Sequence, residues 1–124
     1  MNLQTLGLVL LSVSLSALAQ LLLKMGMSSA DVARALLDAP PLRMALAIAS
    51  NRHVLAGLAL YFTSAAVWLF VLARLQLSMA YPFVGLGFIV TMLLGWLFLD
   101  DPLSTTRVAG TLLVTVGVVL IARS

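Results

Sequence analysis

Four long apolar runs dominate this sequence, at residues 3–23, 54–73, 77–99 and 105–122. Each run is close to the roughly 20 residues that an α-helix needs to cross the hydrocarbon core of a bilayer. Charged residues stand at the ends of the runs, and only Arg107, near the start of the fourth run, lies inside one. Strands of a membrane barrel would be shorter and would alternate polar and apolar residues. The sequence therefore predicts an all-α integral membrane protein, with residues 1–124 forming one four-helix transporter domain.

The composition excludes a soluble domain. Of the 124 residues, 63% are hydrophobic and 9% are charged, and the mean hydropathy is +1.17. A soluble domain of this size needs far more polar surface to cover its core. The seven Lys and Arg residues outnumber the four acidic residues. Because they gather at the ends of the apolar runs, we expect them to contact anionic membrane lipids and not nucleic acid.

The connection between the first two runs, residues 24–53, is the longest one. Ser29 followed by Asp31 is typical of a helix start, and Pro40-Pro41 then interrupts the chain. Residues 42–49 are apolar but too short to span, so we expect an interfacial helical segment here. Five of the seven basic residues lie on this side of the membrane, which by the positive-inside rule places the connection in the cytoplasm.

A polar stripe marks the first run. Ser12, Ser16, Gln20 and Lys24 are spaced by four and so share one helix face. The stripe could face a substrate, or it could form hydrogen bonds that hold neighbouring helices together. For Ser12 we favour the second reading, whereas Ser16 and Gln20 fit both equally. Lys24 is either the charged end of a substrate-facing strip or a simple topology determinant.

The third run begins with Ala80-Tyr81-Pro82 and continues through Gly85 and Gly87. Proline removes a backbone donor and clashes with the preceding turn, and the glycines loosen the turns that follow. Pro82, Gly85 and Gly87 therefore predict a hinge for alternating access, with tight helix packing as the alternative. Tyr81 either binds a polar headgroup or belongs to the interfacial aromatic belt.

The fourth run carries Gly110 and Gly117, which are seven residues apart and share a face. Small residues allow another helix to approach closely. We expect a dimer seam formed by these glycines with Leu113 and Val114, and intramolecular packing is the alternative.

No ionisable residue lies deep in any run, so a proton-coupled cation exporter has no obvious carboxylate. The sequence carries no catalytic motif or metal-ligand cluster, so we expect a transporter without cofactors and not an enzyme.

These features together resemble the drug/metabolite transporter superfamily (EamA-type) in its small four-helix form. The pattern of Gly110, Leu113, Val114 and Gly117 resembles the dimerisation motif of the small multidrug resistance family. The glutamate that this family carries in its first span would fall at Ser16. The proton-coupled cation export of the family is therefore not carried over to this chain.

The chain is most similar to the subunits of the 4-amino-4-deoxy-L-arabinose-phosphoundecaprenol flippase. The similarity rests on residues 16–21 with Lys24, on Trp68-Leu69 with Val71-Leu72, on Ala80-Tyr81-Pro82, and on residues 101–104 followed by Gly110. It implies a dimeric bundle in the bacterial inner (plasma) membrane that flips a polyprenyl-phosphate-linked sugar. The partner would be an identical chain or a related four-helix subunit.

We accordingly expect basic side chains to bind the phosphate and uncharged polar side chains to bind the sugar. The candidate phosphate-binding residues are Lys24, Arg43, Arg52 and Arg74, and the candidate sugar-binding residues are Ser16, Gln20 and Tyr81. Two alternatives stay open. One is an exporter of small molecules or cations of the small multidrug resistance type, and the other is a non-transporting accessory subunit of a membrane complex.

Overall fold

The computed structural model describes residues 2–124, and this part of the chain contains helices and no strands. Four segments are long and apolar enough to cross a membrane: α1 (Leu3–Met27), α4 (Arg52–Arg74), the third span (Leu77–Leu99) and α7 (Thr105–Arg123). Each agrees with a predicted run to within a few residues. The all-α fold with four transmembrane helices is therefore confirmed.

The third span is not one uninterrupted α-helix. It consists of α5 (Leu77–Ala80), the 3-10 helix η1 (Tyr81–Gly85) and α6 (Leu86–Leu99). Pro82 lies in the first turn of η1, where proline is tolerated because the first turn of a helix does not need its backbone N–H. The irregularity that the sequence predicts at Pro82 and Gly85 is thus present as a tighter winding of the backbone.

Two short helices connect α1 to α4, where the sequence predicted a helix start and one interfacial segment. They are α2 (Ala30–Asp38) and α3 (Pro41–Ser50). Ser29 precedes α2 as expected, but its side chain makes no cap bond there. Instead its Oγ accepts a hydrogen bond from Asn51 Nδ2 at 3.0 Å, while Asn51 Oδ1 caps α4 by accepting from the backbone N–H groups of His53 and Val54. This link fixes the start of α2 to the start of α4.

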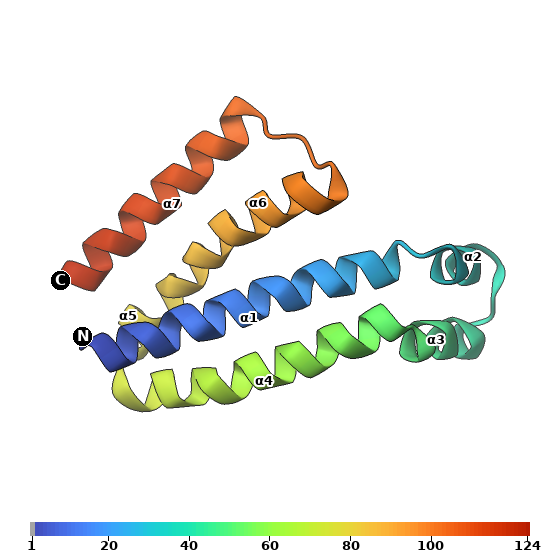
Figure 1. The fold of residues 1–124 in the computed structure, drawn as a ribbon, viewed down its shortest axis with the longest axis horizontal. Helices are drawn as coiled ribbons and strands as arrows, with labels where there is room; N and C mark the ends of the chain where they lie inside the picture. The colour runs from blue at the N-terminus through green and yellow to red at the C-terminus, as the bar shows by residue number, and fades with distance from the viewer. Residues whose placement is uncertain (1) are drawn as a thin grey trace.

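Helices α1 and α4 form the closest pair in the fold and run antiparallel along their length (Figure 1). Small residues allow the approach: a Cβ added to Gly26 would lie 2.5 Å from Val54 Cγ2, and one added to Gly57 would lie 2.8 Å from Leu23 Cγ. Midway along the pair, Ser12 Oγ donates to the Ser64 carbonyl at 3.0 Å and Ser64 Oγ donates to the Ser12 carbonyl at 2.8 Å. Ser12 therefore joins two helices, as its packing interpretation predicts.

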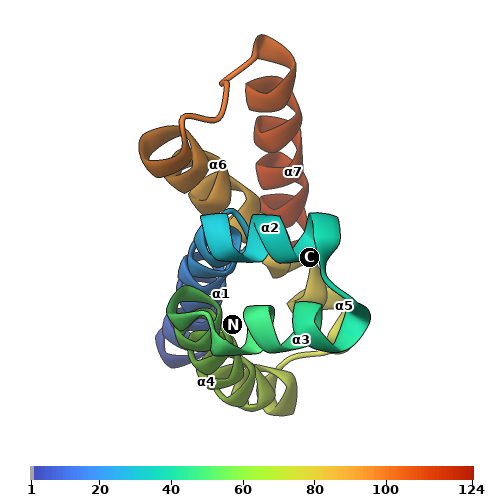
Figure 2. The same ribbon diagram turned by 90° about the vertical axis from the view of Figure 1, so that its right-hand side faces the viewer.

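The hydrophobic core lies toward the end of the bundle where the two termini meet. It contains Val9 and Val13 of α1, Val71 of α4, Ala80 and Phe83 of the third span, and Val118 of α7. Toward the opposite end, the hairpin of α6 and α7 leans away from α1 and α4 (Figure 1), and Figure 2 shows the same separation from that end. The helices are therefore closed at one end of the bundle and spread at the other.

Helix α7 is the least packed of the four spans. Val118 is its one buried residue, and Val114 reaches Gly85 of η1, where an added Cβ would lie 2.7 Å from Val114 Cγ1. Five other large apolar side chains of α7 are exposed, namely Leu112, Leu113, Val116, Val119 and Leu120. Within one chain, most of the surface of α7 is free to contact lipid or another protein.

Candidate functional site

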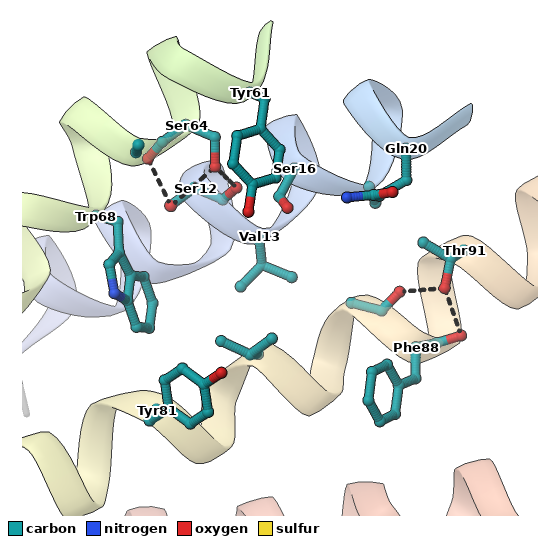
Figure 3. A pocket seen from close by; sticks show the side chains of 14 residues that line it. Ser12, Val13, Ser16, Gln20, Tyr61, Ser64, Trp68, Tyr81, Phe88 and Thr91 are labelled. Carbon is teal, nitrogen blue, oxygen red and sulfur yellow. Dashed lines mark hydrogen bonds between the residues drawn. The ribbon is translucent and has the colours of Figure 1, made fainter. Parts of the chain in front are cut away.

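A cavity of about 600 Å³ lies between α1, α4 and the third span. We call it the polar groove, and Figure 3 shows its walls. Its lining consists of Ser12, Val13, Ser16, Ala17, Gln20, Tyr61, Ser64, Ala65, Trp68, Tyr81, Val84, Gly87, Phe88 and Thr91. The volume falls in the range of about 300–1,000 Å³ that is usual for ligand pockets.

Ser16 and Gln20 offer uncharged polar groups to a ligand in the groove. Among residues 2–124, neither Ser16 Oγ nor the Gln20 amide takes part in a hydrogen bond, although both side chains line the groove. Thr91 differs, because its Oγ1 donates to the Gly87 carbonyl at 2.9 Å and is thereby engaged by its own helix. Ser16 is half-buried and Gln20 is exposed, so both side chains can reach a polar ligand in the groove.

Aromatic side chains form much of the remaining wall. Tyr61 and Trp68 come from α4, and Tyr81 and Phe88 come from the opposite side of the groove (Figure 3). Tyr81 is 65% exposed, so this wall also borders the surroundings of the bundle. The groove thus combines flat apolar surfaces with a few polar groups, and it borders the outside of the bundle at Tyr81.

A second pocket of about 230 Å³ continues from the groove toward the α2–α3 end. The two share Ala17, Gln20 and Thr91, and the second pocket adds Lys24 from α1 and Asp101 from beyond α6. The two pockets are therefore neighbours: the uncharged groove lies beside a second pocket that carries both a cation and an anion.

The polar stripe of α1 does not stay on one face of the helix. Four residues advance an α-helix about 40° beyond a full turn, so the stripe rotates about 120° from Ser12 to Lys24. Ser12 accordingly faces α4, Ser16 and Gln20 face the polar groove, and Lys24 faces the second pocket. The stripe is a path that winds from one neighbouring helix to another.

The four candidate phosphate-binding residues do not form one cluster. Lys24, Arg43 and Arg52 lie on helices that meet at the α2–α3 end, whereas Arg74 ends α4 at the opposite side of the bundle (Figure 1). The 22 residue steps from Arg52 to Arg74 correspond to about 33 Å. All four side chains are exposed. Lys24 alone lines either pocket, and Tyr81 lies toward the Arg74 end.

The predicted hinge residues lie where α1 and α7 meet the third span. Gly85 accommodates Val114, and a Cβ on Gly87 would lie 3.4 Å from Val13 Cγ1. Close packing and irregular winding therefore coincide in this segment. Its use as a hinge remains a prediction.

The predicted dimer seam is largely unpacked within the chain. No atom lies within 4 Å of a Cβ built on Gly110 or Gly117, and Leu113 is 73% exposed. Intramolecular packing thus does not explain the two glycines. Val114 differs because it reaches Gly85 of its own chain.

Several lining residues carry no role in the sequence-based predictions. Tyr61, Ser64, Ala65 and Trp68 follow the spacing i, i+3, i+4, i+7, which places them on one face of α4. The mixed polar and aromatic character of this face could have predicted that it lines a pocket. Asp101 gives only the weaker signal of a carboxylate just beyond an apolar run.

The sequence is similar to those of known membrane transport proteins. Residues 41–114 match the model of the family described as Small Multidrug Resistance protein. The probable 4-amino-4-deoxy-L-arabinose-phosphoundecaprenol flippase subunit ArnF of Photorhabdus laumondii is 34% identical, over 92% of this chain and 93% of the relative. The subunit of the same description from Shewanella sediminis is 33% identical, over 98% of this chain and 89% of the relative.

A shorter similarity links the chain to the other subunit type. The probable flippase subunit ArnE of Pseudomonas aeruginosa is 39% identical over 57 residues, which cover 46% of this chain and 50% of the relative. No solved structure matches the chain significantly. Together with the four apolar helices, these similarities establish a multi-pass membrane protein of a transporter family.

Proposed function

Since this chain belongs to the small multidrug resistance family and is similar to ArnF-type flippase subunits over most of its length, we propose that it is a flippase subunit. It moves a polyprenyl-phosphate-linked sugar, an undecaprenyl phosphate glycolipid, across the bacterial inner membrane. The reaction is transport without covalent chemistry. The observation that carries the proposal is the pair of adjacent pockets, in which the uncharged polar groups of Ser16 and Gln20 lie beside the cation of Lys24.

The two pockets suit the three chemical parts of such a lipid. Ser16 and Gln20 offer hydrogen bonds to sugar hydroxyl groups, and the aromatic wall offers flat apolar contact to the sugar ring. Lys24 can donate charge-assisted hydrogen bonds to the phosphate. The open side near Tyr81 lets the apolar tail remain in the bilayer while the headgroup is enclosed.

The remaining basic residues act at the two ends of the path. Arg43 and Arg52 lie at the end where Lys24 lies and would raise the local concentration of phosphate lipids. Arg74 lies at the far end and would meet the headgroup as it leaves. Pro82, Gly85 and Gly87 would allow the third span to open one end or the other.

Replacing Lys24 with alanine tests the phosphate contact. We expect Lys24→Ala to lower the rate of lipid translocation about tenfold, because one charge-assisted contact to the phosphate is lost. The purified protein would be reconstituted in liposomes, and a labelled polyprenyl-phosphate sugar would be followed across the bilayer.

Arg123→Ala is the matched control, because it also removes one exposed cation at a helix end but lines neither pocket. Equal losses in the two variants would contradict the phosphate contact. Proton-dependent flux of a quaternary cation without lipid movement would favour the exporter of the small multidrug resistance type. Absence of both activities would favour the accessory subunit.

The flippase acts as a dimer, with an identical chain or a related four-helix subunit as the partner. The support is the exposed face of α7 with Gly110, Leu113 and Gly117, on which nothing from the same chain packs. Without packing, the two glycines would only weaken the helix.

A photoreactive benzophenone side chain placed at Leu113 should therefore form a covalent adduct with a second protein chain in the membrane. The product would have about the mass of two four-helix subunits on a denaturing gel. The same side chain at Phe62, which is 72% exposed on α4, should label lipid only. Protein adducts of equal yield at both positions would argue against a seam on α7.

A further inference from the structure

The carboxylate of Asp101 is held at the mouth of the second pocket by the way α6 ends. Asp100 adopts the left-handed conformation with φ of 56°, and the N–H of Asp101 donates to the Gly95 carbonyl at 3.1 Å. This turn folds Asp101 back over the last turns of α6. Gly95 provides the space, since a Cβ added there would lie 2.5 Å from Asp101 Oδ2.

The fold does not use this carboxylate for its own stability. Ser104, not Asp101, caps α7 by accepting from the N–H of Arg107 at 3.1 Å, and the Arg107 guanidinium donates to the Pro102 carbonyl. Within residues 2–124, no hydrogen bond involves the Asp101 carboxylate, and the one ion pair joins Arg34 to Asp31. Lys24 and Asp101 thus line one pocket without pairing with each other.

A pocket that carries one unpaired cation and one unpaired anion is complementary to a ligand that carries both charges. Its volume of about 230 Å³ is below the usual range for a whole drug-sized ligand and suits a headgroup. Gln20 lies between this pocket and the polar groove and can bind an uncharged part of the same headgroup.

We propose that Asp101 determines which sugar is accepted: its carboxylate binds a cationic amino group on the sugar while Lys24 binds the phosphate. An amino sugar is the class that the relatives' names give, and the new element is that Asp101 and the second pocket recognise its amine. This inference rests on the proposed flippase function. A headgroup without the amine would leave the carboxylate unpaired and close to its own phosphate, which disfavours that lipid by charge repulsion.

The test compares two lipids in proteoliposomes that contain the protein in the assembly in which it is purified. One is a polyprenyl-phosphate amino sugar, and the other carries a hydroxyl group in place of the amine. The wild-type protein should move the amino lipid about tenfold faster, since a hydrogen bond between charged groups is gained. Asp101→Asn should lower the rate of the amino lipid and raise the rate of the hydroxyl lipid, because the repulsion of its phosphate is relieved, so that the two rates converge.

Two further variants separate this role from a general effect on folding. Asp100→Asn removes the adjacent carboxylate, which lines neither pocket, and asparagine tolerates the left-handed conformation, so the preference should persist. Gly95→Ala keeps every charge but displaces the Asp101 side chain, and it should reduce the preference for the amino lipid. Lys24→Ala should slow both lipids.

The outcomes distinguish the inference from the function on which it rests. Equal wild-type rates for the two lipids would overturn the role of Asp101 but would still support the flippase function. An equal slowing of both lipids by Asp101→Asn would also overturn it. If the wild-type protein moved neither lipid, the flippase function would be wrong and the inference would fall with it.

Discussion

Replacing Ser16 with leucine should reduce lipid translocation to the level of empty liposomes. The Ser16 side chain lines the middle of the polar groove and has no hydrogen-bond partner among residues 2–124. Leucine would remove a polar group that a sugar can bind and would fill part of a cavity of about 600 Å³ with an apolar side chain. Both changes oppose the passage of a polar headgroup, so we expect a larger loss than from any single change at the mouth. The loss is measured as the rate of lipid translocation in proteoliposomes that contain the Ser16→Leu variant.

Ser14→Leu is the control for this prediction. Ser14 lies two residues away on α1, is exposed and lines neither pocket. The two variants add the same apolar side chain to the same helix, so they should insert into the membrane and unfold alike. Transport by Ser16→Leu at the wild-type rate would exclude the groove as the path of the headgroup, and an equal loss in Ser14→Leu would attribute the effect to the helix as a whole.

Replacing Gly26 with valine should lower the free energy of unfolding by about 2–4 kcal/mol. A Cβ at this position would lie 2.8 Å from Asn51 Oδ1 and 2.9 Å from the backbone N of Val54. The new side chain therefore collides with backbone as well as side chains, and α1 must move away from α4. The same movement would disturb the Asn51 cap of α4. Thermal or denaturant unfolding in detergent measures the change.

Gly7→Val provides the matched comparison within α1, because no atom lies within 4 Å of a Cβ built on Gly7. Both variants carry the same change in helix propensity, so the difference between them isolates the contact of α1 with α4. A similar stability for the two variants would show that the close approach at Gly26 is not maintained in the membrane.

The spans could be predicted from the sequence because the bilayer imposes a simple rule. Backbone polar groups have no partners in the hydrocarbon region, so a long apolar run must be helical. The same reasoning located the irregular segment at Pro82, since proline removes a donor wherever it stands. The link between Ser29 and Asn51 joins residues 22 positions apart, and local cap preferences carry no information about such a pair.

The walls of the site could be predicted only in part. Ser16 and Gln20 were identifiable because polar residues are rare in apolar spans. Val84 and Phe88 were not, because a lipid-facing surface and a packing surface are equally apolar and hydropathy does not tell them apart. The stripe of α1 shows a further limit: equal spacing predicts a common face over two positions, but rotation accumulates, so Ser12 and Lys24 meet different neighbours.

The tight winding of η1 couples two motions of the third span. A 3-10 helix advances about 120° and 2.0 Å per residue, against about 100° and 1.5 Å in an α-helix. If the five residues of η1 rewound into α geometry, α6 would turn by about 100° relative to α5 and draw in by about 2.5 Å. Tyr81 and Val84 lie within η1, and Phe88 and Thr91 lie beyond it. This combined rotation and translation of α6 would turn Phe88 and Thr91 away from the polar groove and bring another face of α6 toward it, without moving α1 or α4.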